Sequence, residues 1–318
     1  MKTVSEAAQW LRGHDDYLII THRRPDGDAV GCAISLCLGL RAIGKRAYIW
    51  ANPQFTPRYA ARLDGLVSQQ VEECTTIISV DMASETLLPV NGDQFAGKIE
   101  FCLDHHPSNT GYAPWTLVQA ECGGCGELIW DVLEELGVEI TKEMAEAIYI
   151  AISTDTGCFR FANTTARTFR TAAKAVEHGA DIAPINRELF EIKSKGRLRL
   201  ESRIMANMEF YADGRVASAC LPQIWVEELE VTEDDLDSIS GFARTIDGVQ
   251  VGVMIRDSEP GRAKLSVRTA PGYDASLYCS HLGGGGHHAA AGCAIDGTLM
   301  DGKKAILEVL KKECVIGS

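Results

Sequence analysis

The chain has 318 residues, of which 46% are hydrophobic and 24% are charged, and its formal net charge is −13. Its length is about twice that of a typical single domain, so we expect two domains with globular cores. The negative charge argues against a protein that coats long nucleic acid, although it is compatible with a small phosphorylated substrate held by metal ions.

Short apolar runs alternate with helical patterns in the first half of the chain. Strands are predicted at residues 17–20, 46–50, 76–80 and 99–103, and helices at residues 4–11, 29–43, 126–136, 142–153 and 166–178. This alternation indicates an α/β fold with a mainly parallel sheet, in which ligands lie beyond the carboxyl ends of the strands. Because His22, Asp81 and Asp104 each follow a predicted strand, we expect these side chains to share one site.

The pattern changes in the second half of the chain. Residues 192–213 are predicted to form one long helix, which Gly214 ends. Further strands are predicted at residues 215–221, 248–256 and 263–269, and a final helix at residues 301–312. We therefore predict a first domain at residues 1–190, a helical linker at residues 191–213, and a smaller α/β domain at residues 214–318.

The eleven cysteines do not suggest a disulfide framework. Several, such as Cys32 and Cys102, lie in apolar segments, where a reduced cysteine behaves as a small hydrophobic residue. Cys122 and Cys125 have C-x-x-C spacing, but no second pair of ligands at matching spacing supports a structural zinc. No apolar run reaches the roughly 18–20 residues of a membrane span, and the N-terminus does not resemble a signal peptide. We therefore expect a reducing, cytoplasmic setting and no membrane partner.

Three polar residues, His22, Asp26 and Asp28, lie within seven positions after the first predicted strand. One imidazole and two carboxylates suit a borderline-to-hard divalent cation such as Mn²⁺. For this segment alone, an Asx-rich turn that caps the next helix is an equal alternative. Asp81 and Asp155 add two more carboxylates, and without a cation these charges would meet with no partner. The combined set therefore favours a metal site.

The triplet Asp104-His105-His106, with the motifs before and after it, resembles the DHH phosphoesterase superfamily, which includes RecJ-type exonucleases and family II inorganic pyrophosphatases. Residues 283–292 read GGGGHHAAAG, which is similar to the GGGH-x-x-AAG element of the superfamily's C-terminal associated domain. The chain length and the two-domain layout most resemble the nanoRNase/pAp-phosphatase branch, with cyclic-dinucleotide phosphodiesterases as close relatives.

The resemblance implies a site for two metal ions that Asp81 bridges, with a water or hydroxide between the ions as the nucleophile. The remaining implied ligands are His22 and Asp26 for one ion, and Asp28, His105 and Asp155 for the other.

The resemblance also implies roles for the other two residues of the triplet. Asp104 would orient a ligand or accept a proton. His106 would face the scissile phosphate, where it either donates a hydrogen bond or protonates the leaving oxygen.

The glycine run is a candidate phosphate site. Gly284, Gly285 and Gly286 would let backbone N–H groups approach an anion closely, because no Cβ stands in the way. His287 would add a donor to a terminal phosphate.

A second candidate for phosphate binding lies on the strands before the glycine run. Ser266 and Arg268 belong to a segment that resembles the family's S-x-R-S element, with Thr269 in place of the second Ser, and Arg256 ends the preceding predicted strand. Arginine is a good bidentate phosphate ligand, although surface strands also carry arginine for solubility.

Together these patterns predict a two-metal phosphoesterase that uses Mn²⁺, with Mg²⁺ or Co²⁺ as alternatives. Its expected substrates are short RNA or DNA oligonucleotides, cut from one end, and 3′,5′-bisphosphonucleosides such as pAp. Hydrolysis of cyclic di-AMP or pApA is the alternative activity. A catalytically dead nucleotide sensor is the alternative outside enzymes, and a homodimer is left open.

Overall fold

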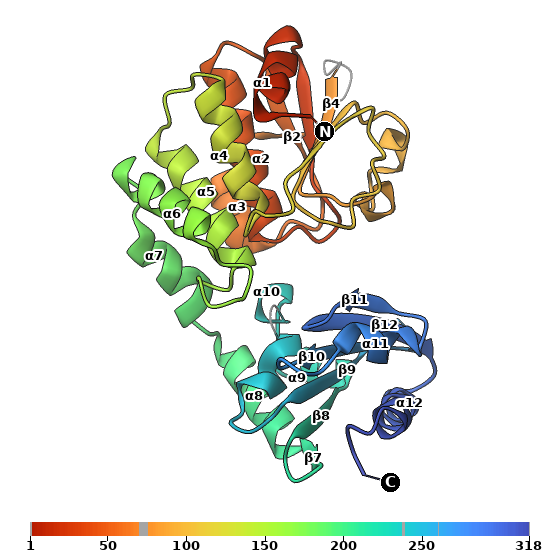
Figure 1. The fold of residues 1–318 in the computed structure, drawn as a ribbon. Coiled ribbons are helices and arrows are strands. Elements are labelled where there is room, and N and C mark those ends of the chain that lie inside the picture. Colours follow the sequence, from red (N-terminus) through yellow and green to blue (C-terminus); the bar gives the residue numbers. More distant parts are fainter. Residues whose placement is uncertain (1, 70–75, 237–238, 260, 318) are drawn as a thin grey trace. The chain divides into compact units, whose positions relative to one another are not determined.

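The computed structural model describes residues 2–69, 76–236, 239–259 and 261–317 (Figure 1). The chain divides into two compact units, Met1–Ile192 and Lys193–Ser318, and each unit contains a six-stranded sheet. None of the helices in the described ranges combines the length and the apolar character that crossing a bilayer requires.

The first unit is built on a parallel sheet with the strand order β3-β2-β1-β4-β5-β6. Its strands are β1 (Tyr17–Ile20), β2 (Ala47–Trp50), β3 (Val67–Ser68), β4 (Thr76–Val80), β5 (Phe101–Asp104) and β6 (Trp115–Val118). The chain builds outward from β1 in one direction and then crosses to β4 on the other side. Connections therefore diverge between β1 and β4, and ligands of such sheets bind outside the carboxyl ends of the strands at this point. The predicted α/β fold with a parallel sheet is confirmed.

Helices cover this sheet, and their packing brings distant parts of the chain together (Figure 1). The longer ones are α1 (Val4–Gly13), α2 (Gly27–Ala42), α3 (Pro57–Leu63), α4 (Cys125–Glu135), α5 (Lys142–Asp155) and α6 (Ala166–Glu177). The short helices are η1 (Glu85–Leu87), η2 (Asp93–Phe95), α7 (Ile182–Asn186) and the π-helical turn η3 (Arg187–Glu191). Helix α2 is apolar almost all round and lies inside the unit, as expected of a helix with no polar face.

Glycines let α2 lie very close to α5. A Cβ on Gly31 would collide with the backbone oxygen of Ala147, and one on Gly27 would lie 2.5 Å from the Thr154 side chain. This close crossing sets the first turn of α2 against the last turn of α5. Asp28 and Asp155, which are far apart in the sequence, are thereby brought to the same place.

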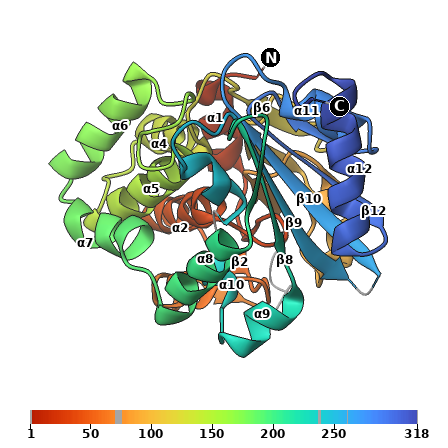
Figure 2. The ribbon, with the colours of Figure 1, turned by 90° about the horizontal axis from the view of Figure 1, so that it is seen from below.

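The second unit contains a mixed sheet with the order β11-β12-β10-β9-β8-β7, in which only β8 and β9 are parallel neighbours among the described pairs. Its strands are β7 (Glu209–Tyr211), β8 (Val216–Leu221), β9 (Val251–Glu259), β10 (Arg262–Thr269), β11 (Gly285–His287) and β12 (Ala290–Asp296). Its helices are α8 (Lys195–Ala206), α9 (Gln223–Glu228), α10 (Glu233–Leu236), η4 (Ile239–Thr245), α11 (Ala275–Ser280) and α12 (Leu299–Lys312). Helix α12 lies along the sheet and contributes to one of its two cores (Figure 2).

The prediction of one helix over residues 192–213 was wrong in its extent. Helix α8 spans only Lys195–Ala206, and Glu209–Tyr211 forms a strand that pairs with β8. Leu200 and Ile204 of α8 are fully buried in a core of the second unit, so this helix packs as part of that unit. The long apolar and basic run concealed a break at Asn207, because a β-strand that follows a helix directly gives no change in composition.

Candidate metal centre

Polar residues meet beyond the carboxyl ends of β1, β4 and β5 in the first unit. His22 follows β1, Asp81 directly follows β4, and Asp104 is the last residue of β5. Helices supply the rest, with Asp26 and Asp28 at the start of α2 and Asp155 at the end of α5. These elements converge where the sheet order reverses, so the fold places one imidazole and several carboxylates at its expected ligand position.

The first group of ligand atoms is formed by His22, Asp26 and Asp81. The Nε2 atom of His22 lies 3.9 Å from Asp26 Oδ1 and 3.9 Å from Asp81 Oδ2. Asp26 also caps α2, because its side chain accepts hydrogen bonds from the backbone N–H groups of Asp28 and Ala29.

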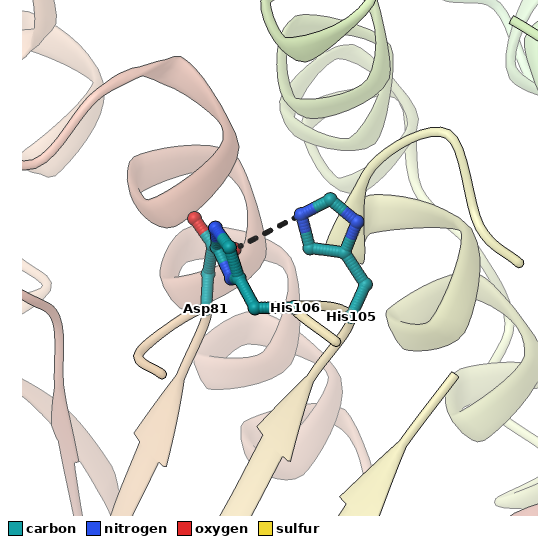
Figure 3. A group of neighbouring side chains, drawn as sticks. All are labelled: Asp81, His105 and His106. Atoms are coloured by element: carbon teal, nitrogen blue, oxygen red, sulfur yellow. Dashed lines mark ion pairs between the residues drawn. The ribbon is translucent and has the colours of Figure 1, made fainter. Parts of the chain in front are cut away.

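The second group is formed by Asp28, His105 and Asp155. The Nε2 atom of His105 lies 3.7 Å from Asp28 Oδ2, 3.8 Å from Asp155 Oδ2 and 3.5 Å from Asp81 Oδ1. Figure 3 shows the imidazoles of His105 and His106 directed toward Asp81 from the neighbouring strand end.

Asp81 belongs to the first group and lies beside the second, and with His105 and His106 it forms a third set of possible ligand atoms. Its Oδ2 atom faces His22, and its Oδ1 atom faces His105. Oδ1 is buried and has no hydrogen-bond partner among the described residues. A buried carboxylate oxygen without a donor is costly, and a cation would satisfy it. The donor set of imidazole nitrogens and carboxylate oxygens also suits divalent transition ions, so these residues fit the two-metal site implied by the resemblance.

Both histidines that face Asp81 through Nε2 have the opposite ring nitrogen occupied. His22 Nδ1 donates to the backbone oxygen of Arg23 at 2.7 Å, and His105 Nδ1 donates to that of Cys122 at 3.2 Å. A carbonyl oxygen can only accept, so each Nδ1 carries the proton. The lone pair of each Nε2 is therefore free to bind a metal.

His106 is held differently. Its Nδ1 atom donates to Asp104 Oδ1 at 2.8 Å, and Asn109 donates to the other oxygen of Asp104 at 2.6 Å. Burial alone would raise the pKa of Asp104, but the hydrogen bonds from His106 and Asn109 outweigh burial and lower it. Asp104 therefore stays ionised and fixes the orientation of His106, whose side chain is 37% exposed.

Two asparagines and a backbone loop were missed by sequence reasoning. Asn109 holds Asp104, and Asn163 donates to Asp155 Oδ2 at 3.1 Å. Residues 122–126 supply backbone partners to His105 and Asp28. No spacing rule marks these partners, because they act through contacts that only the tertiary fold creates.

Neighbouring carboxylates shift each other's titration. Burial raises the pKa of Asp81 well above its ordinary value, and the charge of Asp28 adds to this rise. Burial and the charge of Asp155 raise the pKa of Asp28 in the same way. Without cations, the folded protein therefore binds more protons at this centre than the unfolded chain does.

This excess of protons predicts how the stability of the metal-free protein depends on pH. Stability should fall as the pH rises from about 4 through the raised pKa of Asp81, by up to ~1.4 kcal/mol per pH unit for one proton. In chelator, Asp81→Asn should gain thermal stability over the wild type, and the gain should grow from pH 5 to pH 8. Thermal unfolding followed by circular dichroism measures this difference, and a difference that does not change with pH would contradict it.

The predicted substrate residues lie on the second sheet. Arg256, Ser266 and Arg268 share one face, because Arg256 lies opposite Lys264 and residues two apart on a strand point to the same side. Arg268 is half-buried and donates to Ser240 Oγ at 3.0 Å. Burial lowers the pKa of Arg268 because it disfavours the charged guanidinium. A phosphate anion beside the guanidinium would offset this cost.

The glycine run is a hairpin, and the need for glycine there is mainly steric. Strand β11 includes Gly285, Gly286 and His287 and pairs with β12. A Cβ on Gly284 would collide with the backbone of β12, and one on Gly286 would lie 2.6 Å from the Ala290 oxygen. Gly285 has open space around it, and His287 is exposed. Their role in anion binding stays a prediction.

Comparisons with known proteins extend these observations. The sequence matches the DHH family, N-terminal domain, over residues 16–152 and the DHHA1 domain over residues 214–315. It is 31% identical to the bifunctional oligoribonuclease and PAP phosphatase NrnA of Thermus thermophilus, over 98% of this chain and 94% of the relative. The protein of the same name from Bacillus subtilis is 26% identical over 93% of both chains.

Two solved structures share the fold. The crystal structure of an exopolyphosphatase-related protein from Bacteroides fragilis has a TM-score of 0.81 at 23% identity and covers 97% of this chain and 95% of its own. RecJ from Thermus thermophilus, in complex with Mn²⁺, has a TM-score of 0.57 at 15% identity, over 98% of this chain and 55% of its own. At these identities the likeness shows the fold alone.

Proposed function

The chain belongs to the DHH family, and from this premise we propose that it is a divalent-metal phosphoesterase that hydrolyses short oligonucleotides from one end and 3′,5′-bisphosphonucleosides such as pAp. The match to a relative named for both activities extends over nearly the whole chain and supports this substrate class. We further propose Mn²⁺ as the ion, because mixed imidazole and carboxylate ligands suit it.

One observation supports the proposal most directly, namely the position of Asp81. Its two oxygens face two separate groups of ligand atoms, and the oxygen nearer His105 is buried with no hydrogen-bond partner in the described part of the chain. A purely structural role would not explain a buried, unsatisfied carboxylate among other carboxylates.

The proposed mechanism assigns His22, Asp26 and Asp81 to one ion and Asp28, His105 and Asp155, with Asp81, to the other. When bound, such ions supply a water of lowered pKa and neutralise the charge that develops on the phosphoryl group.

His106 would act on the leaving group. Asp104 holds its Nδ1–H and, being ionised, stabilises the protonated ring. The proton on Nε2 can then pass to the leaving oxygen.

Substrate phosphate is assigned to the second unit, through Arg268 and its neighbours. We expect Arg268→Ala to raise KM for a 5′-phosphorylated dinucleotide by ~10–100-fold and to change kcat less, because charge-assisted hydrogen bonds contribute about 1.5–3 kcal/mol. Arg262→Ala, at the exposed start of the same strand, is the matched control and should leave KM unchanged. An unchanged KM in Arg268→Ala would remove this residue from the phosphate site.

The substrate class is tested by one comparison in Mn²⁺. The assay measures hydrolysis of a dinucleotide, a five-nucleotide RNA, pAp and cyclic di-AMP by the same preparation. Turnover of the first three supports the proposal, whereas turnover of cyclic di-AMP alone would favour the cyclic-dinucleotide alternative. Binding without turnover of any of the four would favour the nucleotide sensor.

A further inference from the structure

Residues 122–126, named loop 122–126, comprise a short loop and the first two residues of α4, and their backbone contacts the second group of ligands. The backbone oxygen of Cys122 accepts the Nδ1–H of His105 at 3.2 Å. The backbone N–H groups of Cys125 and Gly126 donate to the two carboxylate oxygens of Asp28 at 2.6 and 3.0 Å. Two of the three ligands in this group are therefore oriented by one loop.

The third ligand reaches the same loop through Asn163. The side-chain amide of Asn163 donates to the Gly123 backbone oxygen at 2.7 Å and to Asp155 Oδ2 at 3.1 Å. Asn163 thus connects the carboxylate of Asp155 to the loop that holds Asp28 and His105.

A buried glutamate, Glu127, holds the loop through hydrogen bonds. Glu127 is 0% exposed, and its Oε1 accepts the Gly123 N–H at 3.1 Å and the Thr168 hydroxyl at 2.6 Å. Arg167 lies 3.3 Å from the other oxygen, which is buried without a hydrogen-bond partner among the described residues, and burial raises the pKa of Glu127. The two hydrogen bonds to Oε1 connect the backbone of Gly123 to Thr168 and so hold the loop in place beside the metal ligands.

The first group has other supports. His22 is held by the Arg23 backbone oxygen, and Asp26 is held by the first turn of α2. Asn52 donates to the backbone oxygen of His22 at 3.0 Å. Within the described ranges, no hydrogen bond from loop 122–126 or from Asn163 reaches His22 or Asp26.

We infer, resting on the proposed two-metal centre, that Asn163 and loop 122–126 position the ligands of one metal ion only. Asn163 is a positioning residue that acts through Asp155 and the loop. The affinity for one ion should consequently depend on Asn163 and loop 122–126, whereas the affinity for the other should not, although both ions share Asp81.

The test is Mn²⁺ binding to the full-length chain, measured by titration calorimetry and by electron paramagnetic resonance. Asn163→Ala should lower the affinity for one of two Mn²⁺ ions by ~10–100-fold and leave the affinity for the other unchanged, since loss of a group that orients a ligand has this effect. At one equivalent of Mn²⁺, the variant should show the signal of an isolated ion. Because Asn163 is exposed, its loss should leave the far-ultraviolet circular dichroism spectrum intact.

A second variant disturbs the loop independently. A Cβ on Gly123 would lie 2.8 Å from the Asn163 backbone oxygen, so Gly123→Ala should lower the affinity for the same ion. Asn91→Ala is the matched control, because Asn91 also makes side-chain hydrogen bonds in an exposed loop of this unit, to Trp50 and Ala51. It should leave both ions bound as in the wild type.

The outcomes separate this inference from the proposed function. If Asn163→Ala lowers the affinity for both ions equally, or for neither, the selective role of the loop is overturned while the two-metal centre stands. A wild-type protein that binds fewer than two ions would overturn the centre itself and the inference with it.

Discussion

Asp81→Asn is expected to lower kcat by at least ~10³-fold, because it removes the carboxylate that faces both groups of ligands. Each factor of ten corresponds to ~1.4 kcal/mol in the activation barrier. Asn is the sharpest replacement, since Asp81 has a φ of 52° and Asn tolerates this left-handed conformation better than Ala does. The measurement is kcat on a dinucleotide in saturating Mn²⁺.

The chain offers a close control for this variant. Asp16 also has a left-handed backbone, with a φ of 57°, but it precedes β1 and pairs with Arg46. Asp16→Asn should therefore keep kcat within about twofold of the wild type, as surface pairs contribute little. A kcat near the wild-type value in Asp81→Asn would contradict the two-metal mechanism.

His106→Ala is expected to lower kcat on a dinucleotide by ~10²–10⁴-fold, the range for loss of a general acid. Mn²⁺ binding should change far less, because His106 Nδ1 is occupied by Asp104 and none of the proposed metal ligands is removed. The comparison of turnover with a binding isotherm therefore distinguishes a catalytic histidine from a ligand. A loss of Mn²⁺ affinity as large as the loss of kcat would reassign His106 to the metal.

A substrate with a better leaving group separates the two roles considered for His106. A nitrophenyl phosphodiester expels an anion that needs no proton, so His106→Ala should slow it much less if this residue protonates the leaving oxygen. An equal loss of kcat on both substrates would favour a hydrogen bond to the phosphate instead.

Asp104→Asn weakens the hydrogen bond that orients His106 but leaves the imidazole in place. We expect this variant to lower kcat by ~10–100-fold.

Several features of the fold could be predicted from local pattern. The continuous apolar runs that became β1, β4 and β5 indicated a buried parallel sheet, and the structure has one. The helix over residues 192–213 could not be predicted correctly, because the break at Asn207 and the pairing of Glu209–Tyr211 with β8 depend on a partner strand. The steric need for Gly284 was equally hidden, since it arises from the backbone of β12.

What the sequence by itself determined is the chemistry available to this protein. The combined set of His22, Asp26, Asp28, Asp81 and Asp155 already indicated a divalent-metal site, and the Asp104-His105-His106 triplet with the glycine-histidine element indicated the family. Only the tertiary structure decided how the histidines and carboxylates group around Asp81 and His105, and which segments support them. The reason is physical, because ligand identity depends on side-chain chemistry, whereas orientation depends on hydrogen bonds between segments far apart in the chain.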